Sequence, residues 1–132
     1  MASIFSRIIA RELPGYIVAE TSSCIAFLDV HPMVEGHTLC VPKREVDYYY
    51  DLSDEELAEL TRFTKRVATG LRQAVACKRI ANGVLGLEVP HVHVHLVPVS
   101  TTSDFRFGKV VEVSESRMQS LRDEIAAAIP PA

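Results

Sequence analysis

At residues 91–98 the sequence reads His-Val-His-Val-His-Leu-Val-Pro, with histidines at three alternate positions. Successive side chains of a β-strand point to opposite faces, so this stretch predicts a strand over 91–97 with one imidazole face and one aliphatic face. Each imidazole has two ring nitrogens that need partners, and it titrates near neutral pH. Three of them are therefore unexpected on a purely structural surface, and we expect the histidine face to carry chemistry.

Two kinds of chemistry use aligned imidazoles. In a zinc site, two of these histidines would each place a nitrogen about 2.0–2.1 Å from the ion, with His37 or Glu88 as a further ligand. Along a strand, however, His91 and His95 would start about 13 Å apart, too far to share one ion easily. In phosphoryl transfer, a neutral imidazole attacks phosphorus while its neighbours suppress its protonation. The spacing favours phosphoryl transfer and leaves the metal site as the alternative.

Size and charge limit the class of protein. The 132 residues, 48% of them hydrophobic, fit one compact domain over 1–132. A net charge of −3 without a basic stripe disfavours binding to a nucleic acid polymer. The sequence has no recognisable signal peptide and no apolar run of transmembrane length, which predicts a cytoplasmic protein without a membrane partner.

The three cysteines, Cys24, Cys40 and Cys77, are widely spaced in apolar surroundings. This pattern predicts reduced, buried thiols rather than disulfides or metal ligands. Catalysis by Cys40 with His37 is disfavoured, because residues three apart on a strand point to opposite faces.

Periodicity and turn residues predict an α+β domain: an antiparallel sheet of about five strands, one long helix and short terminal helices. Ser53 and Glu56 form a capping-box pattern that opens the long helix, which we expect to run to about Cys77. The other expected elements are a helix at 3–11 over one edge of the site, strands at 16–20, 25–28, 37–41, 80–85 and 91–97, and a helix at 114–129.

The histidine run resembles the His-x-His-x-His motif of the histidine triad family of nucleotide hydrolases and transferases. The segments 4–14 and 86–91 resemble the family's opening helix and the stretch before its triad. The segment 27–43 is similar to the family's strand, loop and strand, and reads Phe-x-Asp-x-x-Pro-x-x-x-Gly-His-x-Leu-x-Val-Pro-Lys. The resemblance covers about residues 3–98 and leaves 99–132 largely unmatched. It implies a histidine-triad-like (HIT-like) fold and a homodimer whose sheets join across a two-fold axis.

The resemblance also implies roles for individual residues. His93 would attack the α-phosphorus and form a nucleotidyl-histidine, His95 would bind phosphate or assist the leaving group, His91 would orient the nucleophile, and His37 would line the leaving-group side. Asp29 would hold the ribose hydroxyls, with a loop-capping role as the alternative. The base would lie between apolar side chains: Phe5, Ile8, Val30 and Leu39. The remaining candidate substrate contacts are Asn82, Gly86, Glu88 and Val89.

The sequence departs from the family pattern at several positions. Leu87 stands where many relatives have a glutamine that contacts the phosphate, the 82–86 stretch is shorter than usual, and Val99-Ser100 stands where many have an arginine. Backbone N–H groups of 86–89, or Ser100, could replace these donors. Ser3 and Ser6 occupy the places of a cysteine pair that binds structural zinc in some members, so no structural zinc is expected.

The resulting hypothesis is a hydrolase of purine nucleoside 5′-phosphoramidates or related nucleotidyl conjugates that needs no metal or other cofactor. One alternative is a dinucleoside polyphosphate hydrolase of the same fold. The other is a weakly catalytic nucleotide-binding or scaffold protein, which the leucine at position 87 favours.

Overall fold

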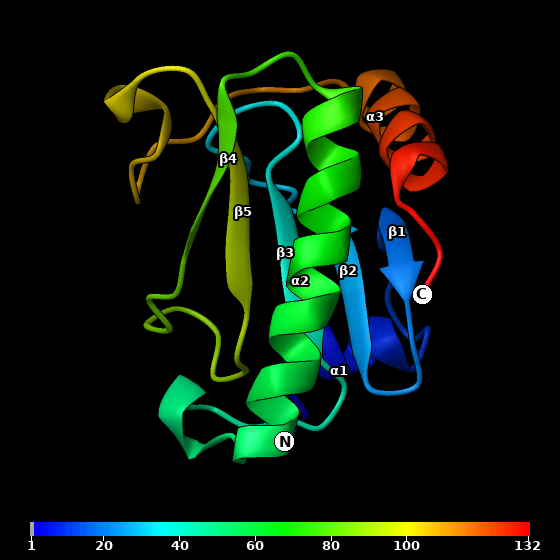
Figure 1. Ribbon diagram of the computed structural model, residues 1–132, viewed down its shortest axis with the longest axis vertical. Helices are drawn as coiled ribbons and strands as arrows, with labels where there is room; N and C mark the ends of the chain where they lie inside the picture. The colour runs from blue at the N-terminus through cyan, green and yellow to red at the C-terminus, as the bar shows by residue number, and fades with distance from the viewer. Residues whose placement is uncertain (1) are drawn as a thin grey trace.

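The computed structural model describes residues 2–132, which form a five-stranded antiparallel sheet flanked by helices (Figure 1). The strand order is β1-β2-β3-β5-β4, so the predicted α+β class is confirmed. The elements are α1 (Ile4–Ile9), β1 (Ile17–Glu20), β2 (Cys24–Leu28), β3 (Thr38–Pro42), α2 (Asp54–Ala74), β4 (Arg79–Gly83), β5 (Val94–Val99) and α3 (Glu115–Ala128), with 3₁₀ turns at Tyr49–Asp51 and Thr102–Asp104.

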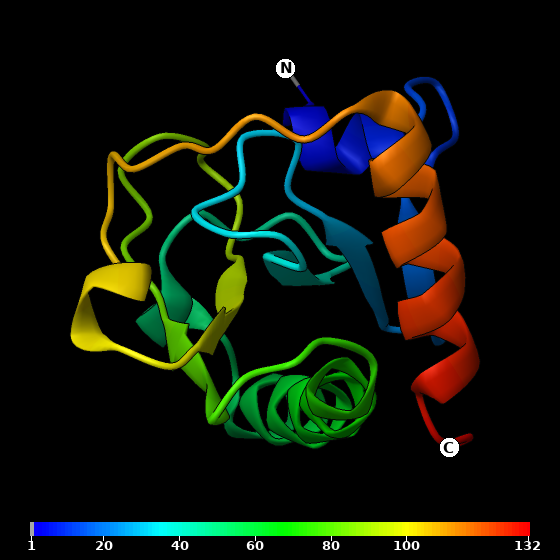
Figure 2. The same cartoon turned by 90° about the horizontal axis from the view of Figure 1, so that it is seen from above.

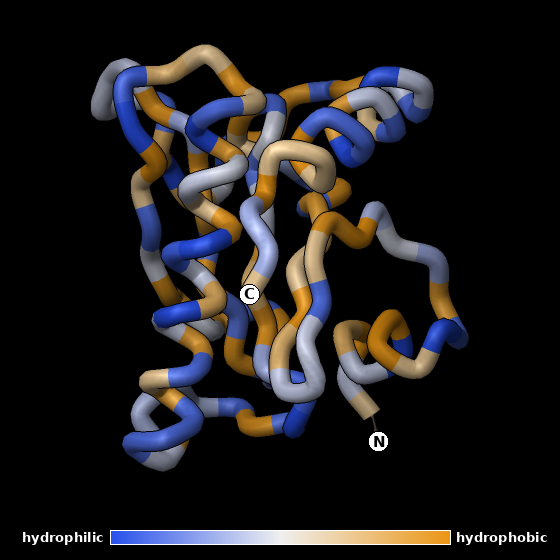
Figure 3. Tube along the Cα trace, turned by 45° about the vertical axis from the view of Figure 1, so that its right-hand side comes forward, coloured by the Kyte–Doolittle hydropathy of each residue, from blue (hydrophilic) through white to orange (hydrophobic). Residues whose placement is uncertain are grey.

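The two faces of the sheet pack against different helices. Alternate strand residues such as Ala26, Cys40 and Leu96 pack with α2 and α3. The residues between them, such as Phe27 and Leu39, pack with α1. Figure 2 shows α1 and α2 on opposite sides of the sheet, with α3 beside β1. In Figure 3 hydrophobic and hydrophilic segments alternate along α2, as expected for a helix with one buried face.

Serine caps open all three α-helices. The predicted capping box of α2 is present: the Ser53 hydroxyl accepts from the Glu56 N–H at 3.1 Å, and the Glu56 carboxylate accepts from the Ser53 N–H at 3.0 Å. At the starts of α1 and α3, the hydroxyls of Ser3 and Ser114 accept from the N–H groups of Ser6 and Arg117, without the reciprocal carboxylate bond. α2 ends at Ala74, three residues before its predicted end, because residues 75–78 turn the chain into β4.

The predicted strand over 91–97 is wrong at its start, because β5 begins only at Val94. The ladder between β3 and β5 ends at the pair Cys40–Val94. The N–H of Val92 instead donates to the carbonyl of Val46 at 2.7 Å, in the loop that follows β3. Residues 91–93 therefore reach the sheet as a loop.

The alternation of side chains nevertheless continues through this loop. Val92, Val94 and Leu96 all belong to the core on the α2 side. The histidines between them lie on the other side, as their spacing predicts. The end of β4 also differs from the prediction, because the strand stops at Gly83, opposite His95, rather than at residue 85.

Cys24 and Cys40 are buried, as predicted, and burial raises the pKa of the Cys40 thiol to about 12. Cys77 is partly exposed because it lies in the turn after α2, so the prediction of a third buried thiol is wrong. Cys40 packs on the α2 side, away from His37, which lies on the cavity side as predicted. Within residues 2–132, no helix has the length and apolar character needed to cross a membrane.

Candidate active site

A cavity of about 530 Å³ opens on the α1 side of the sheet, beside β3 and β5. Its wall combines apolar side chains with a few buried polar groups, which is typical of small-molecule sites. Most of the predicted site residues line it: Phe5, Ile8, Asp29, Val30, His37, Leu39, Glu88, Val89, His93 and His95.

Three predicted site residues do not line the cavity. Asn82 pairs with Leu96 across β4 and β5. Directly paired residues of antiparallel strands point to the same face, so the Asn82 side chain lies on the α2 side of the sheet. Gly86 lies in the loop after β4, next to Leu87, which is 82% exposed. His91 is fully buried and packs against Phe5, with ring centroids 5.9 Å apart.

The hydrogen bond of the His93 ring selects one tautomer of its neutral form. Its Nδ1 lies 2.7 Å from the carbonyl oxygen of His91, and because a carbonyl oxygen only accepts, Nδ1 carries the proton and donates it. In the neutral ring, Nε2 therefore keeps its lone pair. The rings of Phe5 and His95 hold the His93 ring edge-on, with centroids 5.0 and 4.9 Å away. This is the arrangement that a nucleophilic imidazole requires.

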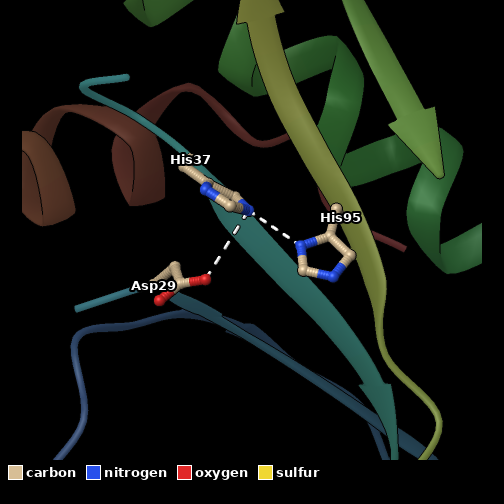
Figure 4. A group of neighbouring side chains, drawn as sticks. All are labelled: Asp29, His37 and His95. Atoms are coloured by element: carbon tan, nitrogen blue, oxygen red, sulfur yellow. Dashed lines mark hydrogen bonds and ion pairs between the residues drawn. The ribbon is translucent and has the colours of Figure 1, made fainter. Parts of the chain in front are cut away.

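A second series of hydrogen bonds fixes the tautomers of His37 and His95. The N–H of Met33 donates to His37 Nδ1 at 2.9 Å, so the proton of neutral His37 is on Nε2. His37 Nε2 donates in turn to His95 Nδ1 at 2.9 Å (Figure 4). The proton of neutral His95 is therefore on Nε2, where it can be donated to a phosphate oxygen or a leaving group.

The protein environment keeps these rings neutral. Burial, together with the charge that a neighbouring imidazole would carry, lowers the pKa of His37 to about 3 and that of His95 to about 4. Burial also lowers the pKa of His91, although the Pro42 carbonyl and Glu45 act in the opposite direction. Near neutral pH these three rings therefore have the single proton that the tautomer assignments require.

The Asp29 carboxylate contacts both the loop after β2 and the wall of the cavity. Its Oδ1 accepts from the N–H of His31 at 2.8 Å, so the alternative, loop-capping role is present. Its Oδ2 lies 3.6 Å from His37 Nε2 at the cavity wall (Figure 4). Burial raises the pKa of this carboxyl group. A carboxylate in this place can accept hydrogen bonds from a vicinal diol.

Asp29, His37 and His95 also form a candidate metal-binding group, since one ligand atom of each lies within 4.8 Å of the others. A metal needs an unprotonated nitrogen from histidine. The N–H of Met33 occupies the lone pair of His37 Nδ1, so the nitrogen that faces the group carries the proton. The chemistry of the group fits a hydrogen-bonded relay better than a metal site, and metal-free activity stays a prediction.

The segment 107–110 also lines the cavity, although the sequence patterns did not identify it. The ring of Phe107 packs edge-on against His95, with centroids 5.1 Å apart, and remains 41% exposed. The Phe105 ring packs edge-on against Phe107 and lies next to Gly83. The N–H of Val111 donates to the Pro32 carbonyl at 2.8 Å, which anchors the end of this segment. The available signal was the pair of phenylalanines in the otherwise polar stretch 100–109.

The fold and the cavity together define a class of enzyme whose site is built from a run of histidines. The HIT domain profile matches residues 10–102. The adenosine 5′-monophosphoramidase of Saccharomyces cerevisiae is 38% identical over 98 residues, which are 74% of this chain and 62% of that protein. The protein of the same name from Schizosaccharomyces pombe is 29% identical over 98% of this chain and 99% of its own length.

A solved structure agrees with these sequence matches. A hypothetical histidine triad nucleotide-binding protein from Sulfolobus tokodaii superposes with a TM-score of 0.81 at 31% identity, covering 95% of this chain and 90% of that one. The chain therefore belongs to the histidine triad family, as its motifs predict, and is an enzyme of that family.

Proposed function

We propose that this enzyme hydrolyses purine nucleoside 5′-phosphoramidates, or related nucleotidyl conjugates, through a covalent nucleotidyl-His93 intermediate. The observation that carries the proposal is the hydrogen bond from His93 Nδ1 to the His91 carbonyl, which puts the lone pair of the neutral ring on Nε2. The two relatives named adenosine 5′-monophosphoramidase support this substrate class.

The reaction proceeds in two displacements. The lone pair of His93 Nε2 forms a bond to the α-phosphorus as the phosphorus–nitrogen bond of the substrate breaks, and the departing amine takes the electron pair and a proton. Water then attacks phosphorus, the electron pair of the phosphorus–histidine bond returns to Nε2, and water gives up a proton. In this proposal His95 donates its Nε2 proton to the departing amine and takes a proton back from the attacking water, so the two steps balance; the hydrogen bond from His37, which puts the His95 proton on Nε2, supports this role.

The rest of the cavity fits a nucleotide. Phe5, Ile8 and Leu39 give the α1 end an apolar wall for the base. Asp29 supplies the acceptor for the ribose hydroxyls, and its position beside His37 keeps the sugar close to the reacting phosphorus. Leu87 lies outside the wall, so it takes no part in holding the phosphate.

We also propose that the enzyme is a homodimer joined through β4. Within the described chain, β4 pairs only with β5, which leaves its other edge open. The loop that follows exposes Val84, Leu85 and Leu87. An open edge with apolar neighbours favours association with a second copy. Sedimentation should give a dimer that Leu85→Asp/Leu87→Asp converts to a monomer, and a monomeric wild-type protein would contradict the proposal.

Intact-mass analysis tests the proposed reaction. The wild-type enzyme is mixed briefly with adenosine 5′-phosphoramidate and quenched, and the released adenylate is measured in parallel. We expect an adenylyl adduct and adenylate release in the wild type and in His31→Ala, whose imidazole lies at the exposed rim of the cavity. Both signals should vanish in His93→Ala.

The other outcomes separate the alternative functions. Binding of adenylate without adduct or turnover would reject the phosphoramidase. Turnover of diadenosine polyphosphates would then indicate the polyphosphate hydrolase. Binding without turnover of any conjugate would indicate a nucleotide-binding protein.

A further inference from the structure

A second polar cluster lies next to the cavity, where the start of α1 meets the loop after β3. It consists of Ser3, Ser6, Glu45 and His91. Glu45 Oε1 accepts from the backbone N–H of Ser3 at 2.6 Å and from the hydroxyl of Ser6 at 2.7 Å. The backbone N–H of Ser6 donates to Ser3 Oγ at 3.0 Å. The hydroxyl hydrogen of Ser3 therefore remains available for His91 Nδ1, which lies 2.6 Å away.

The Pro42 carbonyl sets the tautomer of the His91 ring, and this cluster supplies the partner of its other nitrogen. His91 is 0% exposed, and its Nε2 lies 2.7 Å from the carbonyl oxygen of Pro42, to which it can only donate. The neutral ring therefore has its lone pair on Nδ1, where the Ser3 hydroxyl donates. Without the Ser3 hydroxyl, this buried ring nitrogen would keep only the more distant Ser6 oxygen, at 3.5 Å, whose hydrogen is donated to Glu45. The loss of the close donor is an unfavourable change.

His91 connects the cluster to the nucleophile. Its carbonyl oxygen accepts the hydrogen bond from His93 Nδ1 that leaves Nε2 free. The ring of Phe5, on α1, contacts the rings of both His91 and His93. The start of α1, the His91 ring and the nucleophile therefore form one connected unit.

We propose that Ser3 and Glu45 are positioning residues for transfer at His93: Glu45 holds the start of α1, Ser3 holds the His91 ring, and His91 thereby aims its carbonyl oxygen at His93 Nδ1. The inference rests on the proposed function. Ser3 is 7% exposed, and neither residue belongs to the cavity wall, so both act without touching the substrate. Misplacement of a reacting group by about 1 Å can cost roughly a hundredfold in rate.

Substitutions at Ser3 test the contact with His91. Ser3→Ala removes the donor and should lower kcat for adenosine 5′-phosphoramidate by about tenfold or more, whereas Ser3→Thr keeps a hydroxyl and should restore most of it. Ser3 also caps α1, so the matched control is Ser114→Ala, which removes the equivalent cap of α3. The control should lose thermal stability but keep its kcat.

Substitutions at Glu45 test the hold on α1. Glu45→Ala removes the acceptor for both serines and should lower kcat, whereas Glu45→Gln keeps a side-chain oxygen that can accept both hydrogen bonds and should lower it less. Glu12→Ala is the control, because Glu12 is an exposed carboxylate just after α1 that pairs only loosely with Arg7, at 3.6 Å.

Nitrogen-15 NMR of labelled histidine provides a readout that does not depend on turnover. The wild type should show His91 as the neutral Nε2–H tautomer, and Ser3→Ala should shift the Nδ1 resonance toward that of an unbonded lone pair. Unchanged His91 resonances and kcat in Ser3→Ala would overturn the proposal. A wild type inactive on every conjugate would reject the proposed function instead, and the His91 resonances alone would then decide whether Ser3 positions this ring.

Discussion

The two faces of the central sheet are made by the same strands, yet they bury different kinds of residue. The α2 face is closed by aliphatic side chains such as Leu71, Leu121 and Ile125, each 0% exposed. The α1 face buries His37 and His93 beside its apolar residues. Buried polar groups are tolerated there because each has a hydrogen-bond partner. The contrast indicates that the α2 face supplies stability and the α1 face supplies chemistry, so substitutions should separate the two properties.

The largest expected effect is on the chemical face. His93→Ala removes the proposed nucleophile and should lower kcat at least about a thousandfold, as the loss of a covalent catalyst does elsewhere. Unfolding should remain cooperative, because the α2 core is untouched. Steady-state kinetics and thermal unfolding measure the two properties, and residual activity within tenfold of the wild type would contradict the assignment.

The opposite effect is expected on the α2 face. Leu121→Ala leaves a cavity in the core and should lower the free energy of unfolding by about 2–5 kcal/mol, with KM unchanged at temperatures where the protein stays folded. Glu124 is an exposed neighbour on α3, and Glu124→Ala should change the free energy of unfolding by no more than about 0.5 kcal/mol. Urea titration measures both. A changed KM in Leu121→Ala would show that the two faces are coupled.

The histidines should make the α1 face sensitive to acid. The pKa values of His37 and His95, about 3 and about 4, lie below the ordinary value of 6.5 that the unfolded chain has. Below pH about 6.5 the unfolded chain therefore binds more protons, and the free energy of unfolding falls as the pH falls. Each histidine contributes up to about 1.4 kcal/mol per pH unit to the slope of the free energy of unfolding against pH. Asp29, with its raised pKa, titrates in the opposite sense and reduces this slope at the acid end.

Urea unfolding between neutral pH and pH about 4.5 would measure this dependence. His37→Gln should flatten it, because the variant lacks one of the rings whose pKa the fold lowers. A free energy of unfolding that stays constant over this range would show that the rings titrate in the folded enzyme as they do in the unfolded chain.

The smallest expected effect concerns the edge of the cavity. Phe107→Ala removes an exposed ring beside His95 and should raise KM about two- to tenfold for conjugates with an aromatic amine, the range expected for one aromatic contact. The KM for conjugates with an unsubstituted amide should rise less. Tyr50→Ala removes an aromatic ring that is 73% exposed and lies outside the cavity wall, and it serves as the control. Equal effects on both substrates would mean that Phe107 does not contact the leaving group.

Much of this arrangement could be predicted from local sequence. The alternation at 91–97 identified which side chains share a face, and that assignment holds even where the strand itself is absent, because Val92 still enters the α2 core. The capping residues Ser53 and Glu56 located the start of α2 for a similar reason, since their hydrogen bonds span only three positions in the chain. Patterns of this kind depend on near neighbours alone.

The features that were missed depend on distant parts of the chain. The side on which Asn82 lies follows from its register against Leu96, which tertiary pairing sets. The contact between Phe107 and His95 follows from a loop anchored to Pro32 rather than from any repeated pattern. The tautomers of the histidines likewise require distances to particular backbone atoms, which no spacing in the sequence provides.

Three histidine rings owe their protonation pattern to main-chain atoms: His37 to the N–H of Met33, His93 to the carbonyl of His91, and His91 to the carbonyl of Pro42. Every amino acid has a carbonyl oxygen, and every one except proline has an N–H group. Wall residues other than the histidines can therefore change during evolution, or be redesigned for new leaving groups, without changing which nitrogen of these three rings carries the proton. The range of substrates can therefore change while the tautomers on which the proposed catalysis depends stay the same.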